Sequence, residues 1–520
     1  MGPGPQGNWS AAGPAPATTW SADSGNNILW RAPLTETGQG GIAIANGRAF
    51  VATMAPWKEL GLSASDAKKY AHATEKREVV GKHIDAHCFD LATGTLLWTR
   101  RIEGEVPSIY SYPFSDATSA SPCCDEDYVW FTNAGGQVAC FTHEGQPVWT
   151  RRFTPTYDGP FNKQFEPLLV DDPARGAGCK TLVCMEPTIV YGDEFVTPHS
   201  ALPKWNVLIG LDAASGSELW TSAALTHYNA PTLVQTAQHG PCVLLARGGP
   251  HNVPERPVGM SLVRAAESAT GAAGSVVWQY DDPRGNHEAA LQTMAADDRY
   301  AYWLLKEPHN LLVVIDVLTG KQVREISLVE NVTLHEAPGA GAPTRTPTEP
   351  IAGVMPARYS MHAANGCLWF LTYATAWGKP TLGAPWSLAR IDPLAPDDTK
   401  PTTYVELPTD LQGNYRTKLE ARAFNRRGDE VTGDKRSRWD GWDWVFHPSP
   451  TQVNDLLYFT MPTGIVYVVD TSKTWPDNLC AVNDLGKVGA TWTGNSVSYA
   501  DGRLYHRTAR ELLCIGATKK

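Results

Sequence analysis

The chain lacks the features by which several large protein classes are recognised. It has no run of about 18 apolar residues, so no segment is expected to span a membrane as a helix. It has no P-loop, no GxGxxG turn after a strand, no HExxH, no GxSxG and no EF-hand phrase. The formal net charge of −10 argues against nucleic acid as a partner, because no basic stripe continues along the chain.

The first residues also lack the marks of a secretion signal. Met1 to Gly7 carry neither a basic region nor an apolar core, so no signal peptide is expected in this chain. The protein is then extracytoplasmic (periplasmic or secreted) if a leader was removed, and cytoplasmic otherwise. The ten cysteines do not decide this, because their spacing matches neither a zinc site nor a small disulfide scaffold. The oligomeric state has no signal in the sequence.

What the chain does contain is a recurring hairpin phrase. Residues 83–98 read as an apolar strand, a tight turn at Thr93-Gly94 and a second strand that ends on Trp98. Further copies occupy residues 138–149, 208–220 and 312–324, and residues 271–278 hold a looser one. A hairpin that recurs at intervals of tens of residues indicates a repeat architecture.

A second phrase precedes each hairpin and sets the number of repeats. It consists of a small residue, a short strand, a polar turn and an apolar strand, and it begins near residues 42, 122, 167, 231, 294, 361, 450 and 497. Each unit then forms a four-stranded antiparallel meander. Eight such sheets predict an all-β fold, the eight-bladed β-propeller.

The last unit ends without its tryptophan strand. The missing strand is present before the first unit, as Asn27 to Arg31. We therefore expect residues 28–33 to close the last blade next to residues 512–515. This divides the chain into an N-terminal extension (1–26) and one propeller domain (27–520), with a helical insert at 57–81 and a basic and aromatic insert at 409–445.

The hairpin phrase, roughly LxxLDxxTGxxxW, resembles the blade motif of the quinoprotein-like propellers with PQQ-like repeats. That family includes dehydrogenases that use pyrroloquinoline quinone (PQQ) and a cofactor-free propeller of outer-membrane assembly. The chain is most similar to the members that are not dehydrogenases and are uncharacterised. The resemblance implies that the glycine turns the hairpin and that the tryptophan packs between blades.

The resemblance also raises the question of a quinone. The dehydrogenases place a vicinal cysteine disulfide over PQQ, and Cys123-Cys124 superficially matches it. Their motif continues into an Asn-Arg-Gly turn, whereas Glu126 to Tyr128 here run into a strand. The two cysteines also fill ordinary inner-strand positions, so the sequence argues against PQQ.

Several histidines fall near the expected starts of inner strands, which meet around the propeller axis. His227, His287 and His447 could bind a divalent transition metal together, with Glu288 and His362 as further ligands. The alternative is a set of hydrogen-bonded histidines without metal. No other cofactor is indicated.

A Gly- and Pro-rich loop follows the apolar run that ends at Ala246. Four of its residues could recognise a carboxylate or a sugar: Arg247, His251, Glu255 and Arg256. The alternative is a self-satisfied loop in which Glu255 pairs with an arginine.

The 409–445 insert combines basic and aromatic residues on an acidic protein. Its final part contains Arg438, Trp439, Trp442 and Trp444, and guanidinium groups with indole rings suit anionic ligands and sugar rings. Interspersed acidic residues also allow a solvated, self-paired loop.

These features support two hypotheses of different classes. The first is a binding module that uses its axial funnel and the insert to bind a small molecule or glycan, anionic or carbohydrate in nature. The second is a metal-assisted enzyme on an acidic glycan, a polysaccharide lyase, in which Tyr359 removes the proton and Arg438 neutralises the carboxylate. A PQQ alcohol dehydrogenase is third. Whether the chain is an enzyme stays open.

Overall fold

The computed structural model describes residues 4, 6–55, 79–104, 108–109, 117–153, 166–187, 206–222, 229–247, 257–285, 292–306, 308–335, 344–373, 386–396, 399–407, 425–428, 447–475, 477–487 and 491–517. Nearly all regular structure in this part is β-strand, with one 3-10 turn, Pro173–Arg175. None of its helices has the length and apolarity to cross a membrane.

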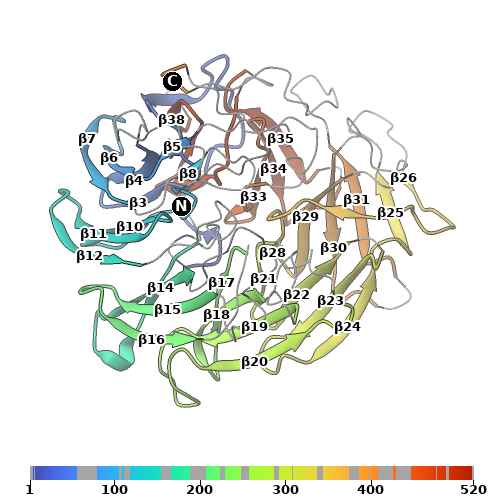
Figure 1. Cartoon of the computed structure of the whole chain (residues 1–520). Helices are drawn as coiled ribbons and strands as arrows, with labels where there is room; N and C mark the ends of the chain where they lie inside the picture. The colour runs from blue at the N-terminus through green and yellow to red at the C-terminus, as the bar shows by residue number, and fades with distance from the viewer. Residues whose placement is uncertain are drawn as a thin grey trace.

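Eight antiparallel sheets follow one another around a ring, so that the blue first sheet lies next to the red last one (Figure 1). The inner strands are β3 (Ala43–Ala45), β9 (Cys123–Cys124), β13 (Leu168–Asp171), β17 (Thr232–Thr236), β21 (Ala295–Ala296), β28 (His362–Ala364), β32 (Thr451–Val453) and β36 (Ser498–Ala500). Every predicted repeat start lies directly before one of them. The predicted eight-bladed propeller is confirmed.

The other three strands of each blade follow in order. The second strands are β4 (Arg48–Met54), β10 (Tyr128–Asn133), β14 (Lys180–Pro187), β18 (Gly240–Arg247), β22 (Tyr300–Leu305), β29 (Cys367–Tyr373), β33 (Leu456–Thr460) and β37 (Arg503–Arg507). The third strands are β6 (Ile84–Asp90), β11 (Gln137–Thr142), β15 (Asn206–Asp212), β19 (Gly259–Arg264), β23 (Leu311–Asp316), β30 (Trp386–Ile391), β34 (Ile465–Asp470) and β38 (Glu511–Ile515). The outer strands are β7 (Leu96–Ile102), β12 (Pro147–Arg152), β16 (Glu218–Ser222), β20 (Val276–Asp281), β24 (Gln322–Ser327), β31 (Thr402–Glu406), β35 (Leu479–Asp484) and β2 (Ile28–Pro33).

The ring closes where the prediction placed it. Strand β2 pairs antiparallel with β38, with Trp30 opposite Cys514 and Pro33 opposite Glu511. The pairing carries a register shift near its start, as the outer hairpins of most other blades do. Strand β2 therefore serves as the outer strand of the eighth blade.

The turn glycines and tryptophans of the hairpin phrase meet between neighbouring blades. Gly94 in the first blade faces Trp30 of the eighth, and Gly216 in the third faces Trp149 of the second; in each case a Cβ on the glycine would lie 2.6 Å from the ring. Trp98 donates a 2.8 Å hydrogen bond from Nε1 to the His143 carbonyl of the next blade. The expected packing role of this tryptophan is confirmed.

Three features depart from a plain propeller. The sixth blade carries β25 (Val332–His335) and β26 (Thr344–Arg345) outside β31, and its inner strand is preceded by β27 (Met355–Pro356) on β29. The expected helical insert at 57–81 lies outside the described residues as far as 78, and its last residues form the strand β5 (Val79–Gly81) rather than a helix. Strand β5 pairs with β8 (Ser108–Ile109).

The segment before β2 folds back onto the propeller instead of extending away from it. Strand β1 (Ser10–Ala11) pairs parallel with β32, the inner strand of the seventh blade. Trp20 stacks on Tyr458 with ring centroids 6.3 Å apart, and its backbone N–H donates 2.8 Å to Asn483 Oδ1. This segment therefore crosses from the axis to the outer edge of the seventh blade.

Candidate functional site

The axis of the propeller is lined by a repeated hydrogen bond between neighbouring blades. The first residue of an inner strand donates to the carbonyl just before the next inner strand. Thr451 Oγ1 reaches Val497 O at 2.8 Å and Ser498 Oγ reaches Ile42 O at 2.9 Å. Thr232 makes the same bond to Met294 O. These side chains hold the blades together.

Cys123 occupies this same position in the second blade. Its Sγ lies 3.2 Å from Pro167 O, so the thiol replaces the hydroxyl of the threonine and serine equivalents. Cys124 is the next residue of the same short strand, and side chains of adjacent strand residues point to opposite faces. Both cysteines are free thiols, and burial raises the pKa of Cys124 to about 12. The argument against PQQ stays a prediction.

On the side where the inner strands begin, called here the start side, polar groups bridge several blades. Thr293 Oγ1 lies 2.8 Å from Tyr359 O and 2.5 Å from Ser449 Oγ. Ser496 Oγ donates 2.7 Å to Ser449 O. The fifth, sixth, seventh and eighth blades are therefore joined close to the axis.

Tyr359, the candidate base, belongs to this bridge through its backbone. The residue is buried and has φ 65°, a left-handed conformation that bulky residues rarely adopt. Burial raises the pKa of its phenol above the usual 10, although Arg358 opposes the shift. A raised pKa leaves less phenolate at neutral pH, which is the opposite of what a general base requires.

Glu166 is the titratable group at the start of the third inner strand. Its Oε2 accepts a 2.8 Å hydrogen bond from the Ser121 N–H. Burial raises the pKa of this carboxyl to about 7, against the hydrogen bonds from Ser121. The carboxyl therefore titrates close to neutral pH.

Two of the five candidate metal ligands are described, and they lie in different surroundings. His447 is buried on the start side, where its backbone N–H donates a 3.1 Å hydrogen bond to Arg358 O. His362 is the first residue of β28, and its Nε2 lies 3.1 Å from Gln452 Oε1. Burial lowers the pKa of His362 to about 4. Within the described ranges no three His, Cys, Asp or Glu residues gather as a metal site.

Arg247 is the last residue of β18 and is 2% exposed. It forms an ion pair with Asp281 and donates 2.9 Å to Tyr280 O, both in β20 of the same blade. The side chain therefore joins two strands of the fourth blade. Its role as a ligand-binding residue stays a prediction that this geometry does not favour.

Part of the 409–445 insert is described, and it is fastened to the junction of the eighth and first blades. Arg427 forms an ion pair with Glu36, and Asn425 Nδ2 donates 3.1 Å to the same carboxylate. Arg426 Nε donates 2.8 Å to Arg510 O. The insert begins after the sixth blade, so it reaches past the seventh to this anchor.

The remaining candidate residues lie outside the described part of the chain. They are His227, His251, Glu255, Arg256, His287, Glu288, Arg438, Trp439, Trp442 and Trp444. Their roles as metal ligands, ligand-binding residues and neutralising group stay predictions.

A groove next to the insert anchor was not predicted from the sequence. It has a volume of about 460 Å³, and its charged lining residues are Asp23, Arg31, Arg426, Lys487, Arg510 and Glu511. Glu511 is paired with Arg31 at 2.9 Å and with Arg426 at 3.7 Å. The basic residues come from four distant segments, so no single stretch of sequence shows them together.

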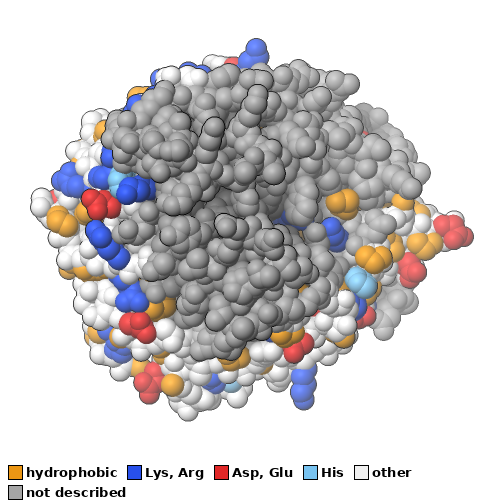
Figure 2. All heavy atoms as spheres, viewed as in Figure 1, with side chains coloured by type: hydrophobic (Ala, Val, Ile, Leu, Met, Phe, Trp, Pro, Cys, Tyr) orange, Lys and Arg blue, Asp and Glu red, His pale blue; other side chains and the backbone are white. Residues whose placement is uncertain are grey.

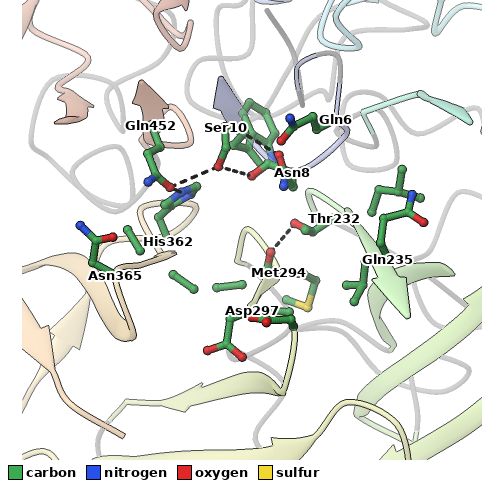
Figure 3. A pocket seen from close by; sticks show the side chains of 18 of the residues that line it. Gln6, Asn8, Ser10, Thr232, Gln235, Met294, Asp297, His362, Asn365 and Gln452 are labelled. Carbon is green, nitrogen blue, oxygen red and sulfur yellow. Dashed lines mark hydrogen bonds between the residues drawn. The ribbon is translucent and has the colours of Figure 1, made fainter. Parts of the chain in front are cut away.

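A second cavity lies at the axis on the opposite side, called here the turn side, where inner strands end in turns. It is lined by inner strands of the third to seventh blades and by residues of the N-terminal segment (Figure 3). Figure 3 shows His362, Gln452, Ser10 and Asn8 along one wall and Asp297 on another. The sequence offered no signal for this contact, because the Gly- and Pro-rich residues before Trp20 have no periodicity.

Known proteins resemble the chain in part of its sequence and in its fold. A family model described as outer membrane protein assembly factor BamB matches residues 81–249. None of the curated proteins matches the chain.

Three solved structures show how far the likeness extends. A quinohemoprotein alcohol dehydrogenase from Comamonas testosteroni is 11% identical over 95% of this chain and 77% of its own, with a TM-score of 0.50. One from Pseudomonas putida HK5 is 12% identical over 95% and 76%, with a TM-score of 0.46. BamB from Moraxella catarrhalis is 14% identical over 76% and 94%, with a TM-score of 0.35. The family match and the blade architecture confirm the resemblance to PQQ-like propellers, and such low identities speak for fold alone.

Proposed function

We propose that this PQQ-like β-propeller is a binding module for an anionic ligand, a sulfated or uronic glycan, which binds beside the anchored insert. The observation that carries the proposal is the charge of the groove at that anchor. Four of its lining residues are basic (Arg31, Arg426, Lys487 and Arg510), while two are acidic (Asp23 and Glu511). On a chain with a net charge of −10, this local excess of positive charge favours anions.

The distribution of ion pairs supports the same proposal. Glu511 is satisfied by Arg31 and Arg426, which also fix the wall of the groove. Lys487 and Arg510 are exposed, and in the described part of the chain no carboxylate pairs with either. These two cations are therefore available to sulfate or carboxylate groups of a ligand.

The same proposal assigns the axis a structural role. Its hydroxyl and thiol groups are engaged in bonds between blades, which supports a role for Cys123 in joining blades. The match to the family model of the assembly factor BamB supports a partner-binding role for this module. It also supports an extracytoplasmic location.

The test is calorimetric titration with size-defined heparin and polygalacturonate oligosaccharides, with a neutral glucan of equal length for comparison. We expect the anionic oligosaccharides to bind and the affinity to fall as salt is raised, because counter-ions screen exposed charges. Replacing both Lys487→Gln and Arg510→Gln should weaken binding about tenfold or more, since each exposed pair contributes up to about 1 kcal/mol.

The matched control is Lys321→Gln, which removes an exposed cation from a turn of the fifth blade. It should leave the affinity unchanged. An equal loss of affinity in both variants would show that the effect comes from the net charge of the protein and not from the groove. Absence of any anionic binding would overturn the proposal.

A further inference from the structure

The cavity on the turn side of the axis has the opposite character to the basic groove. Its volume is about 680 Å³, within the range of small-molecule sites. Its described lining contains Asp171, Asp297 and Asp298 but no lysine or arginine. The one histidine, His362, is neutral at pH 7, because burial lowers its pKa to about 4. Such a lining disfavours anions.

Part of the polar lining is already engaged and fixes the walls. Gln452 Oε1 accepts hydrogen bonds from His362 Nε2 at 3.1 Å and Ser10 Oγ at 3.3 Å (Figure 3). Asp297 accepts the N–H groups of Arg299 and Tyr300 and the hydroxyl of Tyr302. These groups are held in place before any ligand arrives.

Other polar groups of the lining remain available. Asp171, Asp298 and Gln235 are exposed toward solvent, and Gln6 joins them from the N-terminal segment. Across the described ranges none of their side chains has a hydrogen-bond partner. Carboxylates accept and amides both donate and accept, which is the combination that hydroxyl groups require.

Trp9 provides a separate observation at the same cavity. It lines the cavity, is 3% exposed, and has φ 63°, a conformation that bulky residues adopt only where the surroundings impose it. Its indole Nε1 is buried and has no acceptor among the described residues. A buried donor without a partner is rare in native proteins, so an acceptor is expected there.

The N-terminal segment holds Trp9 in this position through backbone bonds to two distant blades. Gly7 O accepts 2.7 Å from Leu233 N in the fourth blade, and Trp9 O accepts 2.9 Å from Gln452 N in the seventh. A Cβ on Gly7 would lie 2.7 Å from Leu233 Cβ, so glycine is required for this close approach. The segment therefore completes the cavity across the axis.

We propose that this cavity is a second ligand site, which binds a small neutral polyhydroxy compound of mono- or disaccharide size. The indole N–H of Trp9 donates to a ligand oxygen, while Asp171 and Asp298 accept from its hydroxyl groups. The site differs from the basic groove in position and charge, so it does not depend on the proposed function.

Calorimetric titration of the full chain with neutral mono- and disaccharides and with myo-inositol tests the proposal. We expect at least one of these probes to bind. Trp9→Phe keeps the aromatic ring but removes the N–H, and Asp298→Asn removes an acceptor charge; each should weaken binding about tenfold, the loss of roughly one hydrogen bond.

Two controls keep the result interpretable. Asp501→Asn changes an exposed aspartate in the corresponding turn of the eighth blade and should leave binding unchanged. The Lys487→Gln and Arg510→Gln pair should weaken anionic glycan binding about tenfold or more without affecting the neutral probes. The proposal is overturned if no neutral probe binds, if Trp9→Phe binds as well as the parent, or if spermidine binds in preference to every sugar.

Discussion

A single structural position, the first residue of an inner strand, accounts for two side chains that look functional in the sequence, Cys123 and His362. Thr232, Thr451, Ser498 and Cys123 use it to bond to the next blade, and His362 uses it to reach Gln452. The position tolerates a hydroxyl, a thiol or an imidazole, because each can donate to an acceptor on the neighbouring blade. The role of these residues is therefore structural: their hydrogen bonds hold neighbouring blades together in the ring.

Buried histidines make the stability dependent on pH. Burial lowers the pKa of His87, His362 and His506 to about 4 from an ordinary 6.5. Between these values the unfolded chain binds three protons that the folded chain does not, so the free energy of unfolding falls as pH falls. Glu166 acts in the opposite direction, since its pKa of about 7 lets the folded chain keep a proton above pH 4.5.

His362→Thr tests this linkage while preserving a donor at the same position. It should reduce the slope of unfolding free energy against pH by about 1.4 kcal/mol per pH unit between about pH 4.5 and 6, which is the effect of one proton. Urea unfolding at several pH values measures the slope. An unchanged slope in His362→Thr would contradict the linkage.

At the residue scale the sequence could not distinguish these roles. Arg247 reads as a binding residue beside a Gly- and Pro-rich loop, but its partner Asp281 lies in another strand of the blade. Lys487 and Arg510 carry no motif, although the fold brings them to one groove. The partner of a charged side chain is decided by tertiary contacts, which no local pattern records.

At the scale of the element, the hairpin phrase encodes a contact between blades as well as a turn. Gly320 has φ 68°, and a Cβ there would lie 2.6 Å from the Trp278 ring of the preceding blade. Trp278 Nε1 donates 2.7 Å to Val317 O in the same turn. The turn thus requires glycine for two reasons, backbone conformation and room for the indole.

A matched pair of substitutions separates these reasons. Gly366 has φ 70° and open space where a Cβ would be. Gly366→Ala should therefore cost only the left-handed backbone, about 1–2 kcal/mol, whereas Gly320→Ala should cost about 1–3 kcal/mol more from displacing Trp278. Chemical unfolding measures both. Equal losses of unfolding free energy in the two variants would show that the Trp278 ring can be displaced at no energetic cost, so that its contact between blades is weak.

Elements were predictable because their signals are local and repeated eight times. Small residues before short apolar strands marked all the inner strands, and the hairpin phrase marked the outer hairpins of the first five blades. The two-residue strand β1 was missed, since its pairing with β32 depends on a contact more than 400 residues away. The added strands β25 and β26 were missed because β25 pairs with β31, the outer strand of the sixth blade, which comes much later in the chain.

At the scale of the whole molecule, the ring depends on one non-local pairing. Strand β2 covers β38, whose residues Leu512 to Ile515 are buried. Without β2 this apolar edge would be open, and an unpaired strand edge promotes association with other chains. Two deletions distinguish this closure from the contact that the N-terminal segment makes at the axis.

Deleting residues 1–13 removes β1 and Trp9 but leaves β2 on the eighth blade. We expect this variant to stay monodisperse, with a modest decrease in melting temperature and complete loss of neutral sugar binding. Deleting residues 1–34 removes β2 as well. Because Trp30, Ala32 and Leu34 pack in one buried cluster with Tyr505, Leu512 and Cys514, we expect a loss of about 5 kcal/mol or more and visible aggregation. Calorimetric melting and light scattering compare the two, and equal behaviour of both deletions would refute closure by β2 as the principal tie between the first and last blades.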